Sequence, residues 1–241
     1  ANYGFSSIIG LTYSLVAIAS IVAPILLGVI ADRFFSSERV LGVLHFLCGG
    51  ILLWVPHQLE VGNQTAFITL MFLYLLCLMP TRAITNTIAF YHVEDSERQY
   101  PIIRVFGTIG WIVAGIFIGQ LGLSSSSAIF TVSAVVSLLL GIYSFTLPYT
   151  PAEGKSAVFS KRDLFKVDAF KLFKDRNFAV YMICAVIVFI PAAAYNSFTS
   201  NFLGSLGFEK VGSIMTIGQM FEVVFMILVP FFLVRLGVKY M

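Results

Sequence analysis

A carboxylate and an amide lie in the middle of an apolar segment near the end of the chain. Glu222 and Gln219 both fall within the apolar run 211–234, which is long enough to cross a bilayer. A charged group at that depth is costly unless it faces a partner, a cavity or a proton. The two residues are three positions apart and therefore share one face of a helix. We expect this face to carry function, because intramembrane acids mark functional sites by default.

A second polar face is predicted where the segment 105–121 begins. Arg104, Thr108 and Trp111 are spaced i, i+4 and i+7, so a helix places them on one side. A guanidinium, a hydroxyl and a large aromatic ring suit a polar, planar ligand. The alternative is an interfacial arginine that snorkels beside a tryptophan of the membrane belt. Spacing alone leaves both interpretations open.

Polar side chains also interrupt two other apolar segments. Asn196 lies well inside the segment 178–203, where hydrogen bonding between helices is the common role of such a residue. Arg82, with Asn86 one turn later, lies inside the segment 66–91. Arg82 and Glu222 are the only charged residues well inside the apolar segments. Arg82 could line a cavity, or it could pair with an acid elsewhere in the protein.

Composition predicts that membrane helices position these residues. The chain is 59% hydrophobic and 11% charged, whereas a soluble domain is about 25% charged. Each apolar run is continuous rather than alternating, which is typical of spanning helices. The fold class is therefore predicted to be an all-α polytopic membrane protein. The predicted spans are Ser7–Ile30, Val40–Val55, Ala66–Tyr91, Val105–Leu121, Ala128–Leu147, Phe178–Leu203 and Val211–Val234.

Basic residues predict the orientation of these seven spans. They gather in alternate connections: after the first span, before the fourth, before the sixth and after the seventh. The connections 56–65 and 122–127 have none, and 204–210 has only Lys210. We therefore expect the N-terminus of the chain outside and its C-terminus in the cytoplasm.

The long connection before the sixth span divides the chain into five spans and two. Apolar residues recur at helical spacing among lysines from Leu164 to Phe173, which predicts an amphipathic helix on the inner leaflet. Ser160, with Asp163 three residues later, suits the N-terminus of that helix. We expect residues 1–147 to belong to an N-terminal bundle, 148–177 to form a cytoplasmic linker and 178–241 to begin a C-terminal bundle.

Cysteines and histidines do not form a recognisable site. The three cysteines all fall in apolar runs, which favours small buried side chains over a disulfide framework. The three histidines are scattered and show no metal-ligand spacing. We therefore expect no metal, no cofactor and no enzymatic activity.

The first cytoplasmic turn carries a motif that resembles a known signature. Gly28, Asp32 and Arg33 form a Gly-x-x-x-Asp-Arg pattern, which is similar to the loop between the second and third helices of the major facilitator superfamily. Gly28 permits close helix approach, and Asp32 can pair with a basic group or a helix N-terminus. A weaker echo at 235–239 follows the seventh span, where the second half of such a transporter would repeat it. Taken alone, the motif is also compatible with an ordinary polar turn.

Over nearly its whole length the chain resembles the nucleoside:proton symporters of that superfamily. The resemblance rests on the segments 26–32, 101–110, 147–151, 172–174 and 230–233, and on Gln219 with Glu222. It implies a transporter of twelve spans in two halves, with substrate bound between the halves near the midplane. On that template the seven spans are similar to helices two through eight, so we expect the chain to be a fragment that is inactive alone.

The resemblance also implies site residues and a mechanism. The family's substrate residues carry over to Arg104, Thr108, Asn196, Gln219 and Glu222, and Trp111 stands where the family has a phenylalanine. Ala193 stands where a glutamine is expected, so one polar contact is missing. The implied function is import of nucleosides with protons across the bacterial inner membrane by alternating access. The implied protein is a monomer in lipid that binds no nucleic acid.

Two alternatives were weighed against this interpretation. A seven-helix receptor has the same topology. However, the outside loops contain no cysteine pair that could form a disulfide, and the third span lacks an Asp-Arg-Tyr-like triplet. No lysine lies within the seventh span, which disfavours a retinal protein. A transporter of the same superfamily could instead carry a sugar or a drug, although the segment 105–121 lacks the Gly-Pro pair of drug antiporters.

Overall fold

Apolar runs become long helices throughout the part of the chain that the structure describes. The computed structural model describes residues 5, 8–23, 35–123, 126–152 and 167–237, and among these it contains helices and no strands. The α-helices are α1 Ile9–Ala23, α3 Ser37–Val61, α4 Gln64–His92, α5 Ser96–Gln120, α6 Ala128–Ser144, α8 Arg176–Ser205 and α9 Val211–Leu236. A 3-10 helix, η4, covers Val167–Lys174. The predicted all-α class is confirmed.

Most of these helices are long enough to cross a membrane. By length and composition α3, α4, α8 and large parts of α5 and α9 qualify as spans. The apolar stretches of α1 and α6 are shorter, and α1 ends where the described residues end. α6 stops at Ser144, three residues before its predicted end, because a turn leads into Pro148. α5 begins at Ser96, nine residues before the predicted span, and Pro101 lies inside the helix.

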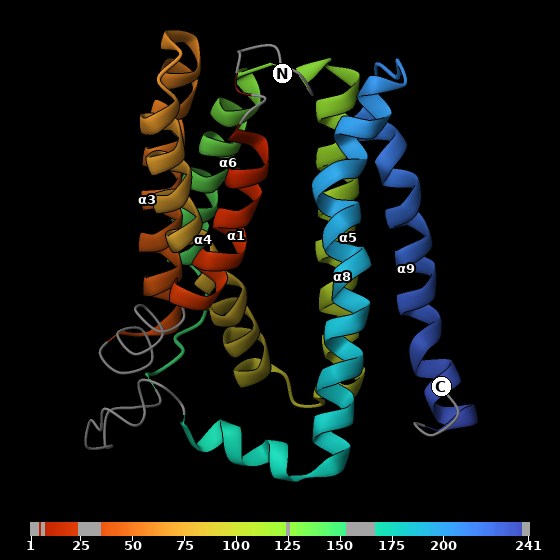
Figure 1. The fold of residues 1–241 in the computed structure, drawn as a ribbon. Coiled ribbons are helices and arrows are strands. Elements are labelled where there is room, and N and C mark those ends of the chain that lie inside the picture. The colour runs from red at the N-terminus through yellow and green to blue at the C-terminus, as the bar shows by residue number, and fades with distance from the viewer. Residues whose placement is uncertain (1–4, 6–7, 24–34, 124–125, 153–166, 238–241) are drawn as a thin grey trace.

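Two groups of helices lie side by side in Figure 1. α3 packs against α4 and α6, and α1 packs against α4. α5 and α9 form an extensive contact in the other group, which also contains α8, and η4 runs along the base (Figure 1). α5 belongs by sequence to the residues before the linker, yet its main described contact is α9 from after it. The boundaries at 147 and 178 stay a prediction.

Small residues let α3 and α6 approach closely. A Cβ added at Gly49 would lie 2.6 Å from Leu138 Cγ and 3.0 Å from the carbonyl oxygen of Ala134. A Cβ at Gly141 would lie 3.2 Å from the carbonyl oxygen of Gly42. Membrane helices associate largely through such close packing, since lipid is as apolar as the side chains. This pair forms a firm support behind α4.

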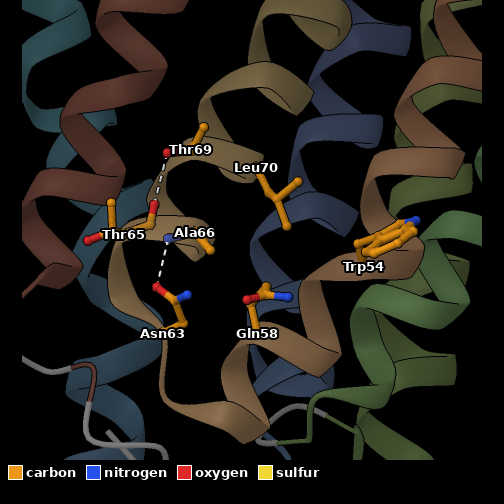
Figure 2. Close-up of a pocket in the computed structure, with 7 residues that line it drawn as sticks. All are labelled: Trp54, Gln58, Asn63, Thr65, Ala66, Thr69 and Leu70. Atoms are coloured by element: carbon orange, nitrogen blue, oxygen red, sulfur yellow. Dashed lines mark hydrogen bonds between the residues drawn. The ribbon is translucent and has the colours of Figure 1, made fainter.

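A short hairpin joins α3 to α4. Gly62 takes a left-handed conformation with φ 78°, which ends α3 at little steric cost. Asn63 then caps α4, because its Oδ1 accepts from the Ala66 N–H at 3.1 Å (Figure 2). The hairpin sets the two helices antiparallel, and their polar faces therefore keep a defined register.

The chain after α6 returns to the start of α3. The Thr150 N–H donates to Glu38 Oε2 at 3.0 Å, and the Ser37 N–H donates to the Thr150 carbonyl at 3.0 Å. The Thr150 hydroxyl also lies 3.0 Å from His92 Nε2 at the end of α4. Thr150 is only 1% exposed. These bonds anchor the beginning of the linker to the ends of α3 and α4.

The predicted amphipathic segment is only partly described. Its expected start at Ser160 and Asp163 lies outside the described residues, and the described part is a 3-10 helix. A repeat of three residues matches a 3-10 turn, which explains why Val167, Phe170 and Phe173 suit this form. The Phe173 ring packs edge-on against Phe178 of α8, with centroids 5.4 Å apart. Its place on the membrane surface stays a prediction.

Candidate functional site

Polar side chains from several helices line one cavity of about 530 Å³. That volume lies in the range of sites that enclose a small molecule. The lining residues are His45 of α3, Thr81, Arg82, Thr85 and Asn86 of α4, Arg104, Gly107, Thr108 and Trp111 of α5, Leu140 of α6, and Gln219 and Glu222 of α9. All the predicted binding residues except Asn196 therefore meet at this cavity.

α5 supplies one wall of the cavity through its helical repeat. Arg104, Thr108 and Trp111 lie on the cavity face, as their spacing predicts. Thr108 is 8% exposed, and its hydroxyl lies 3.4 Å from the Arg104 carbonyl oxygen and 3.8 Å from the sulfur of Met226 in α9. The Trp111 ring is 61% exposed, so most of its surface is available for contact. This wall offers a cationic group and an aromatic platform.

α9 supplies a second wall. Gln219 and Glu222 are one turn apart and both line the cavity. A carboxylate in a cavity can meet water or a ligand instead of lipid, which removes most of the cost of placing it in an apolar segment. The amide and the carboxylate of this wall both offer acceptor oxygens.

α4 supplies a third wall, which begins just after a proline. Pro80 lies inside α4 and leaves one backbone carbonyl without its usual donor. Arg82 and Asn86 follow and both line the cavity. Of the two roles considered for Arg82, the structure places it at the cavity. The Asn86 Oδ1 accepts from the Tyr100 hydroxyl at 2.9 Å, which links α4 to the start of α5.

The remaining predicted residues lie elsewhere. Asn196 of α8 does not line the cavity, and its amide donates to the carbonyl oxygen of Ala192 at 2.9 Å, one turn earlier in the same helix. Its role in binding stays a prediction. Gly28, Asp32 and Arg33 of the signature motif lie outside the described residues.

Beyond the cavity, α5 and α9 touch through small residues. A Cβ at Gly115 would lie 2.6 Å from Thr216 Cγ2, and one at Gly119 would lie 2.8 Å from the backbone nitrogen of Ser213. A Cβ at Gly212 would lie 3.0 Å from the Gly115 carbonyl oxygen. We call these five residues the α5–α9 seam. None of the seam residues lines the cavity.

Sequence reasoning missed three polar residues of the cavity. His45, Thr81 and Thr85 all line it. His45 is 7% exposed, and its Nδ1 has no hydrogen-bond partner among the described residues. Its position in the middle of an apolar run is the same signal that identified Glu222. Thr85 shares a helix face with Arg82 three residues earlier, so the spacing could have found it too.

A second pocket of about 420 Å³ lies at the α3–α4 hairpin (Figure 2). Trp54, Gln58, Asn63, Thr65 and Thr69 line it, together with Ala66 and Leu70. Some of its polar groups already serve the helix start, since Asn63 caps α4 and the Thr69 hydroxyl donates to the Thr65 carbonyl at 2.9 Å. No charged side chain lines this hairpin pocket. It is therefore a weaker candidate than the cavity between α4, α5 and α9.

Known proteins resemble the chain along its whole length. The sequence model of a family described as "Nucleoside H⁺ symporter" matches residues 1–241. The putative nucleoside transporter YegT of Escherichia coli is 40% identical over 98% of the chain, which covers 56% of YegT. Xanthosine permease and nucleoside permease NupG of the same organism are each 31% identical over 96% of the chain, which covers 58% of each relative.

Solved structures agree with the sequence comparison. A crystal structure of a point mutant of the nucleoside transporter NupG has a TM-score of 0.81 and 29% identity, over 98% of this chain and 63% of that one. A second NupG crystal structure has a TM-score of 0.75 over 99% of this chain. The family resemblance expected from sequence is thereby confirmed, and it disfavours the seven-helix receptor. The chain spans less than two thirds of the length of these relatives.

Proposed function

Because the chain belongs to the nucleoside H⁺ symporter family, we propose that the protein imports nucleosides together with protons. The observation that carries this proposal is the cavity between α4, α5 and α9, which brings Arg104, Trp111 and Glu222 to one site. The relatives are named as nucleoside or xanthosine transporters and permeases, which supports a transporter and not an enzyme.

The chemistry of the walls fits the two parts of a nucleoside. A flat base can stack on the Trp111 ring, a contact worth roughly 1–3 kcal/mol in other aromatic platforms. The Arg104 guanidinium can donate to oxygen atoms on the edge of the base. Ribose hydroxyls can donate to the Glu222 carboxylate and the Gln219 amide oxygen. Asn196 belongs to this proposed set if the two helix groups move closer.

Transport requires the site to face each side of the membrane in turn. We infer that the helices before the linker rock against those after it, with the bundles divided at residues 147 and 178. The basic loops support a cytoplasmic C-terminus and an outside N-terminus in a bacterial inner membrane. Gly28, Asp32 and Arg33 would act in the conformational change, and the protein would work as a monomer in lipid.

Proteoliposomes that contain the protein encoded by the full reading frame provide the test. An inward proton gradient should drive accumulation of labelled uridine, and collapse of the gradient should abolish it. Unlabelled nucleosides should compete with the label, whereas sugars should not. If only sugars competed, the substrate would be another polar solute and not a nucleoside. Equal uridine uptake with and without the proton gradient would contradict symport.

A further inference from the structure

Two arginines line the cavity from neighbouring helices, Arg82 from α4 and Arg104 from α5. A guanidinium carries N–H donors and no acceptor. Arg82 and Asn86 are four residues apart on α4, so they share a face with one side chain above the other. The acceptor oxygens of Gln219 and Glu222 come from α9.

A hydrogen bond from Tyr100 engages the oxygen of the Asn86 side-chain amide. The Tyr100 hydroxyl donates to Asn86 Oδ1 at 2.9 Å, which engages one of the two lone pairs of the amide oxygen and fixes the orientation of the amide. The amide nitrogen, with its two N–H groups, is left for the cavity that Asn86 lines. Arg82, Arg104 and the Asn86 amide therefore present donors from α4 and α5.

The Tyr100 hydroxyl is itself held in place. Its ring stacks on Phe90 of α4, with centroids 4.4 Å apart and an interplanar angle of 24°. Tyr100 is half-buried at the start of α5, close to the end of the cavity that Asn86 occupies. Two contacts to α4, one aromatic and one polar, thus fix the phenol that orients the amide.

We propose that Arg82 and Asn86, oriented by Tyr100, form a subsite that selects nucleosides with an oxo group over those with an amino group on the base edge. The inference rests on the proposed nucleoside transport. An oxo oxygen accepts from these donors, whereas an exocyclic amino group is a donor and would leave them unpaired. Uridine should therefore be preferred to cytidine, and inosine to adenosine.

The test compares these two pairs, whose members differ at the oxo or amino group and at the adjacent ring nitrogen, which is an N–H donor in the oxo member and an acceptor in the amino member. Uptake of each nucleoside is measured in proteoliposomes with the protein from the full reading frame. The wild type should favour the oxo member by about tenfold or more, the usual worth of a hydrogen bond to a charged donor. Equal uptake of both members would overturn the proposal. No uptake of any nucleoside would instead overturn the proposed function.

Three substitutions locate the selectivity. Arg82→Gln introduces an amide that can also accept, and Asn86→Asp replaces the amide donors by acceptors. Each should lower the oxo-to-amino ratio several-fold, with the larger fall for Asn86→Asp. Tyr100→Phe keeps the ring that stacks on Phe90 and frees the Asn86 amide to rotate, so the ratio should fall less.

A matched control separates selectivity from general damage. Arg176 is an exposed arginine at the start of α8 and does not line the cavity, so Arg176→Gln should leave the ratio at the wild-type value. Binding ratios measured on purified protein replace uptake for any variant that reaches the membrane poorly. Ratios that stay at the wild-type value in all three cavity variants would overturn the assignment to Arg82, Asn86 and Tyr100.

Discussion

α5 and α9 meet in two different ways along their length. At the seam, Gly115 and Gly119 let the backbones touch, and a Cβ at either position would collide with α9. Within about three turns of the seam, the same two helices carry Arg104, Trp111 and Glu222 around a cavity of about 530 Å³. Small residues permit backbone contact at the seam, whereas large or charged side chains line the cavity. One helix pair thus combines a close packing contact with a polar site in the adjoining stretch.

The largest expected effect comes from the cavity acid. Glu222→Gln keeps the shape of the side chain but replaces charged acceptors by a neutral amide. We expect the affinity for uridine to fall by about 1.5–3 kcal/mol, the worth of hydrogen bonds to a charged group. Glu209 is exposed in the turn before α9 and does not line the cavity, so Glu209→Gln is the control. Equal affinities of the two variants in equilibrium binding would remove Glu222 from the site.

The Trp111 ring should contribute slightly less to uridine affinity than Glu222 does. Trp111→Ala removes the stacking surface and should cost about 1–3 kcal/mol of uridine affinity, whereas Trp111→Phe should restore most of it. Trp54 provides a control, since it lines the hairpin pocket and is 66% exposed. If Trp54→Ala weakened uridine binding and Trp111→Ala did not, the hairpin pocket would be the better site.

Substitutions in the α5–α9 seam should change the free energy of unfolding. A methyl group at Gly115 meets Thr216, so Gly115→Ala should lower the free energy of unfolding by about 1–3 kcal/mol through overpacking. Gly110 lies on the same helix with nothing within 4 Å of an added Cβ. Gly110→Ala should therefore stabilise the helix, by about 0.5–1 kcal/mol. Thermal unfolding in detergent measures both, and a stabilising Gly115→Ala would contradict the close contact.

The smallest effect is expected at Thr150, which belongs neither to the cavity nor to the seam. Thr150→Val removes the hydroxyl that lies 3.0 Å from His92 and keeps the backbone bonds to α3. The free energy of unfolding should fall by about 0.5–1.5 kcal/mol, with uridine affinity unchanged. Thr146 is exposed and donates to a nearby carbonyl, so Thr146→Val serves as the control in the same unfolding measurement.

Hydrophobic length predicted the helices well because a bilayer demands long apolar segments. The ends were less predictable: the span was predicted to begin at Val105, yet α5 begins at Ser96, and its candidate membrane span begins at Gln99. η4 is a 3-10 helix, and its apolar repeat of three positions fits this form but also fits an amphipathic α-helix. Local pattern cannot separate these two forms.

The sequence likewise predicts some features of the candidate site and not others. Helical spacing placed Arg104, Thr108 and Trp111 on one face, and the cost of a buried charge drew attention to Glu222. Which faces meet is a tertiary property, so spacing alone could not place Arg82 at the cavity that it lines. His45 was missed because an isolated histidine in an apolar run is more often a core residue than a ligand contact.

A structure of the protein with uridine bound tests the central claim most directly. Density for the base should lie against the Trp111 ring, and density for the ribose should lie within hydrogen-bond distance of Glu222. Uridine seated in the hairpin pocket beside Trp54, with the cavity between α4, α5 and α9 filled only by water, would contradict the account.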